Sequence, residues 1–153
     1  MGNQKGIHIT PVTKQFEEAA RQLILTGLKE RFGFLDPSYN LDLISIIQSY
    51  NGKGEVFLVG LHNNELLCTG ALIKERSNVG RIQRMSVKKT YRRAGLAKLM
   101  IQALEIRARE EGYNQVVLET NNSWHSAIEF YKNRGYQLKC KDKERSHFVK
   151  KLV

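Results

Sequence analysis

The chain has 153 residues, of which 41% are hydrophobic and 26% are charged, and it contains two prolines. This composition excludes a disordered chain and predicts one domain, over residues 1–153, with its own hydrophobic core. The formal net charge of +10 favours acidic partners such as nucleotides, nucleic acid or anionic membranes, without choosing among them. No apolar run reaches the roughly 20 residues that a membrane-spanning helix needs, so we expect no membrane partner.

The two cysteines, Cys68 and Cys140, lie far apart and show neither metal-ligand nor redox spacing. We therefore expect no metal site, and two reduced thiols that line the core of a cytoplasmic protein. Residues 1–10 are short and mixed in polarity, so we expect no signal peptide there.

The first part of the chain predicts a strand followed by two helices. Residues 7–10 alternate in polarity and predict an edge strand that ends at Pro11. Thr13 can cap a helix over residues 14–31, which Gly33 ends.

An apolar patch, Phe32, Phe34 and Leu35, precedes a turn signal at residues 36–37. A second helix is expected over residues 40–50, with an inward face formed by Leu41, Ile44, Ile47 and Tyr50.

The hydrophobic period then changes from helical to extended. Residues 56–61 and 66–74 flank a tight turn and predict a β-hairpin. A third strand of this group is expected over residues 79–87. Helix three follows over residues 95–111, with a narrow polar stripe of Lys98, Gln102, Glu105 and Arg109.

The last part of the chain begins with the short apolar run 116–118, which is typical of a central parallel strand. A fourth helix is expected over residues 124–134, and Gly135 ends it. Two final strands are expected over residues 136–138 and 147–149. The pattern predicts one α/β domain with a mixed sheet.

A basic loop at the start of helix three predicts an anion site. The chain has no acidic residue from Ile82 to Leu104, and the helix start is surrounded by Lys88, Lys89, Arg92, Arg93 and Lys98. A helix N-terminus carries partial positive charge and free N–H groups, so we expect an anion from outside the chain, most simply a phosphate. The Gly-Lys-Ser/Thr of a P-loop is missing, which argues against a nucleoside triphosphate.

Two strand ends, Met85-Ser86-Val87 and Leu118-Glu119-Thr120, are followed directly by helices. Ligands of open α/β sheets bind outside the carboxyl ends of the strands. If these two strands are neighbours that splay apart, a long thin ligand can enter between them. It would bond to the strand edge near Met85 and rest its phosphates on the loop.

Two motifs resemble the signatures of the GNAT family of N-acetyltransferases. The loop reads Arg92-x-x-Gly95-x-Ala97, similar to the family's Arg/Gln-x-x-Gly-x-Gly/Ala, and it follows a strand that ends in Met85-Ser86-Val87. The later segment 127–136 resembles the second signature, Ala-x-x-Phe-Tyr-x-x-x-Gly-Phe/Tyr. The resemblance implies a mixed, mostly antiparallel central sheet that is splayed between strands four and five and flanked by four helices.

The resemblance also implies acetyl-CoA as co-substrate, and it assigns residues to its binding. These are Met85, Ser86, Val87, Arg92, Arg93, Ala94, Gly95, Leu96, Ala97, Lys98, Asn121, Ser126 and Lys132. The chain departs from the family at two positions, with Lys89 where Pro is frequent and Trp124 where Asn is frequent. Asn121 or Asn122 could supply the contact to the pantetheine arm that Trp124 does not.

Catalytic roles follow from the same resemblance, which implies direct attack of a primary amine on the acetyl group. Tyr131 is the candidate acid for the departing thiolate, a transfer that is uphill by about 1.5 pKa units. The N–H of Met85 or Ser86 is the candidate oxyanion donor. The base is open: Glu119 is the first candidate by position, Glu75 and His125 are others, and ordered water is an alternative.

Two other functions compete with N-acetyltransfer to a small-molecule or protein amine. A catalytically silent acyl-CoA sensor would keep the phosphate loop. A nucleic-acid-binding domain fits the charge, but no stacking platform, helix-turn-helix or zinc spacing appears. The acceptor itself is not indicated, although the first two helices and the hairpin are expected to line its pocket. A homodimer stays open.

Overall fold

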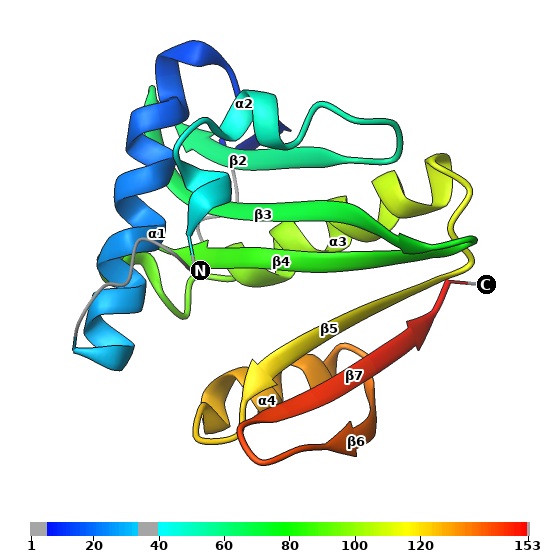
Figure 1. The fold of residues 1–153 in the computed structure, drawn as a ribbon. Coiled ribbons are helices and arrows are strands. Elements are labelled where there is room, and N and C mark those ends of the chain that lie inside the picture. Colours follow the sequence, from blue (N-terminus) through cyan, green and yellow to red (C-terminus); the bar gives the residue numbers. More distant parts are fainter. Residues whose placement is uncertain (1–5, 34–39, 153) are drawn as a thin grey trace.

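The computed structural model describes residues 6–33 and 40–152. One seven-stranded sheet runs through the molecule, and Figure 1 shows the helices arranged around it. The strands are β1 (His8–Pro11), β2 (Val56–His62), β3 (Glu65–Arg76), β4 (Val79–Val87), β5 (Gln115–Asn121), β6 (Gln137–Lys141) and β7 (Arg145–Lys151). The α-helices are α1 (Glu17–Phe32), α2 (Ile46–Ser49), α3 (Leu96–Glu110) and α4 (His125–Asn133), and short 3-10 turns lie at Lys14–Phe16, Leu41–Leu43 and Lys89–Tyr91.

The strand order is β1-β2-β3-β4-β5-β7-β6, and each neighbouring pair is antiparallel except β4 and β5. This confirms the mixed, mostly antiparallel sheet. The sequence did not indicate that the last strand, β7, inserts between β5 and β6.

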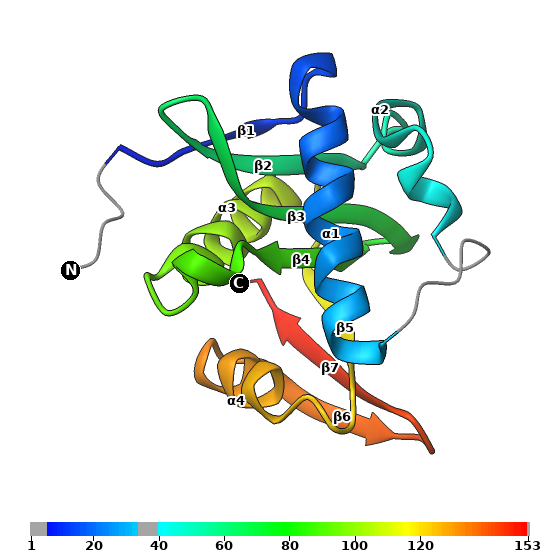
Figure 2. The same ribbon diagram turned by 90° about the vertical axis from the view of Figure 1, so that its left-hand side faces the viewer.

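The helices cover both faces of the first half of the sheet (Figure 2). On one face, α1 and the segment 40–50 bury Ala20, Ile24 and Ile46 against β2 and β3. On the other face, α3 buries Met100 and Leu104 against β2, β3 and β4. Burial of apolar side chains on both sides is the main stabilising term for these strands.

β4 and β5 pair over three residues and then separate. The pairs are Val79 with Gln115, Gly80 with Val116, and Arg81 with Val117, whereas β5 pairs with β7 along its whole length. In Figure 1 the two strands lie close at the right and diverge toward the left. The expected splay between strands four and five is therefore present, and none of the described strands lies beside residues 82–87 on the β5 side.

The prediction for residues 40–50 was wrong in its continuity and its inward face. Ser45 has an extended backbone (φ −141°, ψ 91°), which separates the 3-10 turn from α2 and changes the phase of the helix. Leu43 and Ile46 are therefore buried, while Leu41 and Ile44 are 63% and 69% exposed. Tyr50 is buried as expected.

Three smaller expectations concerned the polar stripe of α3, the two cysteines and the apolar patch after α1. Glu105, expected on the polar stripe of α3, is buried, and Ile106 is exposed instead. Cys68 is buried, but Cys140 is exposed and does not line the core. The patch and turn expected at Phe34, Leu35 and residues 36–37 lie outside the described residues. Within residues 6–33 and 40–152, no helix is long and apolar enough to cross a membrane.

Candidate active site

The loop between β4 and α3 turns sharply at two left-handed residues. Arg93 has φ +70° and Gly95, the N-cap of α3, has φ +85°. No acidic residue lies in the first turn of α3, and the N-cap residue Gly95 has no side chain that could cap it. A helix start of this kind is suited to bind an anion, as the sequence predicted.

The cations of this loop are in part neutralised from within the chain. Arg92 donates to Glu30 of α1 at 3.0 Å, and Lys89 lies 3.7 Å from the same carboxylate. The hydrogen bond from Arg92 lowers the pKa of Glu30. The expectation of an anion only from outside the chain thus needs correction. Among the described residues, Arg93 and Lys98 form no ion pair.

The open edge of β4 presents backbone groups of Met85 and Val87. The Lys88 N–H donates to the Leu67 carbonyl of β3 at 2.8 Å, and Ser86 is in register with Thr69 of β3. Because successive residues of an antiparallel ladder face alternate sides, Val87 and Met85 face away from β3. Accordingly, the Val87 carbonyl accepts a hydrogen bond from Arg92 Nε at 3.1 Å.

The connection from β5 to α4 is held by its asparagines. Asn121 Oδ1 accepts hydrogen bonds from the N–H and the hydroxyl of Ser123. Asn122 accepts from Ser146 and donates to the Asp142 carbonyl. Both amides thus shape the turn. Farther along, Ser126 and Lys132 are exposed on α4.

Trp124, which stands in place of the family's Asn, packs against the end of α1. Its ring lies 5.5 Å from the Phe32 ring, between centroids, and the Arg31 guanidinium lies 4.4 Å from its centroid. The last turn of α1 therefore contacts the residue that begins α4.

Tyr131 lies on α4 in an aromatic group with Phe130, Tyr136 and Phe148. It is 7% exposed, and burial raises the pKa of its hydroxyl, an effect that nearby Arg31 partly opposes. No described residue forms a hydrogen bond with this hydroxyl. A neutral phenol without a hydrogen-bond partner in the described part of the chain can donate to a ligand.

Glu119 lies on the opposite face of β5, among cations that the sequence analysis missed. Its carboxylate is 3.0 Å from Arg145, 3.4 Å from the His147 ring and 3.8 Å from Arg81. Strand alternation could have shown that His147, the cross-strand partner, shares its face. Of the other base candidates, Glu75 bonds to Arg81 at 2.7 Å. His125 is exposed.

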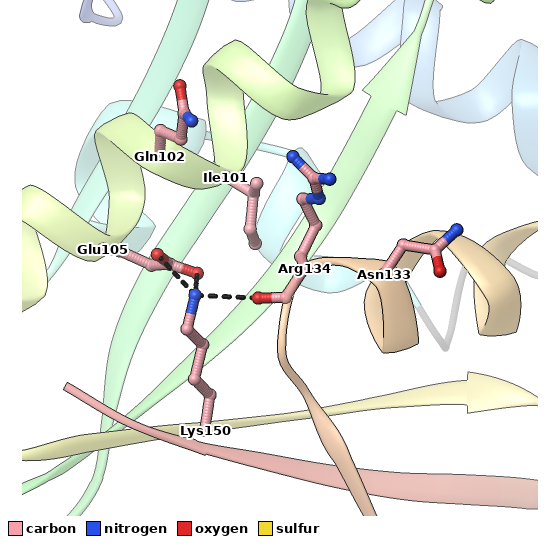
Figure 3. Close-up of a pocket in the computed structure, with 6 residues that line it drawn as sticks. All are labelled: Ile101, Gln102, Glu105, Asn133, Arg134 and Lys150. Atoms are coloured by element: carbon pink, nitrogen blue, oxygen red, sulfur yellow. Dashed lines mark hydrogen bonds and ion pairs between the residues drawn. The ribbon is translucent and has the colours of Figure 1, made fainter.

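A hollow of about 300 Å³ lies between α3, α4 and β7 (Figure 3). Its lining residues are Ile101, Gln102, Glu105, Asn133, Arg134 and Lys150. None of the predicted site residues lines it, although Lys132 adjoins Asn133 and Lys98 is one helical turn from Gln102.

Comparison with known proteins identifies the family. The model of the Acetyltransferase (GNAT) family matches residues 20–136. The chain belongs to the GNAT family. N-acetyltransferase family 8 member 2 of Rattus norvegicus is 34% identical over 101 residues, which are 63% of this chain and 45% of that protein. N-acetyltransferase 8 of the same species is 30% identical over 110 residues, or 68% and 50% of the two chains. This GNAT chain thus spans about half the length of the curated relatives it matches.

Solved structures share the GNAT fold at low identity. An acetyltransferase of the GNAT family from Staphylococcus aureus Mu50 has a TM-score of 0.87 and 22% identity, covering 96% of this chain and 99% of that one. The PaiA N-acetyltransferase of Thermoplasma acidophilum, solved with coenzyme A, has a TM-score of 0.79 and 18% identity, covering 95% and 98%. The likeness confirms the GNAT fold.

Proposed function

We propose that the chain is an acetyl-CoA-dependent N-acetyltransferase that transfers an acetyl group to a primary amine by direct attack. One observation carries the proposal: the separation of β4 from β5 opens the strand edge between a basic helix start and the buried Tyr131. The names of its relatives, and coenzyme A in a structural neighbour, support the same function.

The residues present fit a long cofactor with phosphates at one end. Acetyl-CoA supplies the thioester, and the chain holds it in three parts. The pantetheine arm lies along residues Met85, Ser86 and Val87 and forms hydrogen bonds with the backbone groups of Met85 and Val87. Asn121 and Ser126 form further hydrogen bonds with it. The backbone N–H groups of residues 93–98 and the side chains of Arg92 and Arg93 hold the pyrophosphate. The pyrophosphate comes closest to the backbone at Ala94, Gly95, Leu96 and Ala97. Lys98 and Lys132 lie toward the nucleotide end, next to the hollow of Figure 3.

Three groups of the chain serve the reaction. The Met85 N–H, on the open edge, donates to the carbonyl oxygen as negative charge develops there. The Tyr131 hydroxyl gives its proton to the leaving sulfur. Burial raises the pKa of Tyr131, which makes the transfer more uphill but keeps the phenol protonated. Glu119 takes the amine proton through water from the other face of the sheet.

The acceptor is a primary amine of a small molecule or a protein. It enters from the face covered by α1 and the segment 40–50, because α3 and α4 lie on the other side. Location in the cytoplasm and a homodimer remain predictions.

The proposal is tested by binding and by turnover. Acetyl-CoA at micromolar concentration should raise the Tm, because a ligand that binds the folded state stabilises it. An unchanged Tm would exclude both the transferase and the sensor, and it would leave the nucleic-acid-binding domain. Steady release of CoA with a panel of primary amines separates the transferase from the sensor.

A further inference from the structure

Arg84 occupies an unusual backbone position directly before Met85. Its φ is +57°, a left-handed conformation that glycine adopts freely and other residues rarely adopt. The register of β3 and β4 jumps from Ala71–Gln83 to Thr69–Ser86 at the same place. An extra residue in β4 therefore forms a bulge, which redirects the backbone at Met85.

The Arg84 side chain is held as a fork by the segment that follows α1. Its Nε lies 3.0 Å from Asp42 Oδ2 and its Nη2 lies 2.5 Å from Asp42 Oδ1. Nη1 donates to Asn40 Oδ1 at 3.1 Å. Two parallel N–H bonds to one carboxylate fix both distance and orientation, and they are stronger than bonds between neutral groups. The side chain is 16% exposed, so water competes weakly for these bonds.

Asp42 is anchored in turn by buried Tyr50 and, through it, by Gln83. The Tyr50 hydroxyl donates to Asp42 Oδ2 at 2.5 Å, and Gln83 Nε2 donates to the Tyr50 hydroxyl at 2.8 Å. The Tyr50 ring packs on Phe57 of β2 at 5.3 Å. The carbonyl of Arg84 accepts a further bond from Thr69 Oγ1 at 2.7 Å. The bulge is thus fixed both through the side chain of Arg84 and through its backbone.

We propose that Arg84 and Asp42 are positioning residues that set the direction of the Met85 N–H. The inference rests on the proposed function, in which this N–H donates to the carbonyl oxygen. A glycine would satisfy the backbone at this position without strain, so the arginine is explained by its side-chain fork. The fork also links the segment 40–50, beside the acceptor, to the backbone donor.

The substitution Arg84→Gly separates this role from a merely structural one. Glycine accepts φ +57°, so the bulge is kept and only the fork is lost. We expect kcat to fall roughly ten- to hundredfold with KM for acetyl-CoA within about twofold, because small misplacement of a catalytic group has effects of that size. Arg84→Lys cannot form the fork and should lose activity too, although it keeps the charge. Asp42→Asn should show the same split between kcat and KM.

Glu65→Gln is the matched control, because Glu65 pairs at 2.5 Å with Lys88, the residue after β4, but does not contact the bulge. It should leave kcat unchanged. If Arg84→Gly lowers the Tm but not kcat while the wild type turns over, the network only anchors the segment 40–50 and the inference is overturned.

A second measurement does not depend on turnover. The order parameter of the Met85 amide, from ¹⁵N relaxation of the free protein, should be near the rigid value of about 0.85 in the wild type and in Glu65→Gln. In Arg84→Gly and Asp42→Asn it should fall below about 0.7. An unchanged value would overturn the inference even in an active enzyme. A wild type without turnover would instead overturn the proposed function, and the relaxation result would still decide the role of the fork.

Discussion

Glu30 accepts a hydrogen bond from Arg92 at 3.0 Å, so the last turn of α1 places a carboxylate on the loop that begins α3. The next residue, Arg31, lies 4.4 Å over Trp124 at the start of α4. One helical turn therefore touches both the loop after β4 and the turn after β5. In the proposed function, a cofactor phosphate at Arg92 would therefore compete with Glu30.

The substitution Glu30→Gln should strengthen cofactor binding. Removing the carboxylate frees Arg92 and Lys89 for the pyrophosphate, so the Kd for CoA should fall by roughly two- to fivefold, the size expected for an exposed ion pair. The gain should shrink as salt concentration rises. Isothermal titration calorimetry at two salt concentrations measures both effects. Glu110→Gln, which removes the same charge at the far end of α3, is the control. Weaker binding by Glu30→Gln would show that Glu30 supports the loop instead of competing for it.

The substitution Tyr131→Phe should lower kcat by about a hundredfold or more, the usual contribution of a positioned acid. KM for acetyl-CoA should hardly change, because the ring still packs with its neighbours. Burial raises the pKa of Tyr131, and a phenol whose pKa is raised stays protonated to higher pH, so the wild type should lose no activity through this group below about pH 10. Tyr113→Phe, which loses a bond to the Gly54 carbonyl away from the site, is the control. Full turnover by Tyr131→Phe would show that Tyr131 does not protonate the leaving thiolate.

Local patterns were sufficient to predict most elements of the fold. The third strand of its group was predicted at residues 79–87, the bounds of β4, because alternation is bounded there by a turn and a basic loop. Helix α3 differs from the prediction by one residue at each end. The splay between β4 and β5 was predicted from the family resemblance, because the pairing of these two strands is not encoded within either strand.

Contacts between distant segments could not be read from the sequence. Glu30 and Arg92 are 62 positions apart, and Arg84 and Asp42 are 42 apart. Helical periodicity placed Glu105 at the surface, but Lys150 and Tyr136 from the end of the chain supply its partners. Burial of a charged group depends on such partners, which a local pattern does not contain.

The substitution Glu119→Gln should impair catalysis in a pH-dependent way. A substrate amine has a pKa near 10.4, so it must lose a proton at pH 7 but is largely unprotonated above about pH 11. The ratio of wild-type to variant kcat/KM for the amine should therefore be about ten or more at pH 7 and fall toward one as the pH rises to about 11. Glu75→Gln removes another partner of Arg81 and should leave the ratio near one throughout. A loss of activity that is equal at all pH values would show that Glu119 only forms ion pairs. The amine proton would then be taken by water.

The ion pair of buried Glu105 with half-buried Lys150 should stabilise the junction of the two halves of the molecule. Lys150 Nζ lies 3.1 and 3.2 Å from the two carboxylate oxygens (Figure 3). Tyr136 donates to one of these oxygens at 2.8 Å. Lys150→Met should cost about 2–4 kcal/mol of unfolding free energy, because it leaves a buried carboxylate without its cation. Urea unfolding measures the loss.

A double-mutant cycle makes this last prediction specific. Adding Glu105→Gln to Lys150→Met should recover at least about half of the loss, because no uncompensated charge then remains. Arg107→Met removes the partner of Glu111 at the end of α3, where both side chains are partly exposed, and should cost less than about 1 kcal/mol. If Lys150→Met costs no more than Arg107→Met, the carboxylate of Glu105 is solvated in the variant. The junction of α3 with β7 then depends on apolar packing around Ile101 and Phe148 instead.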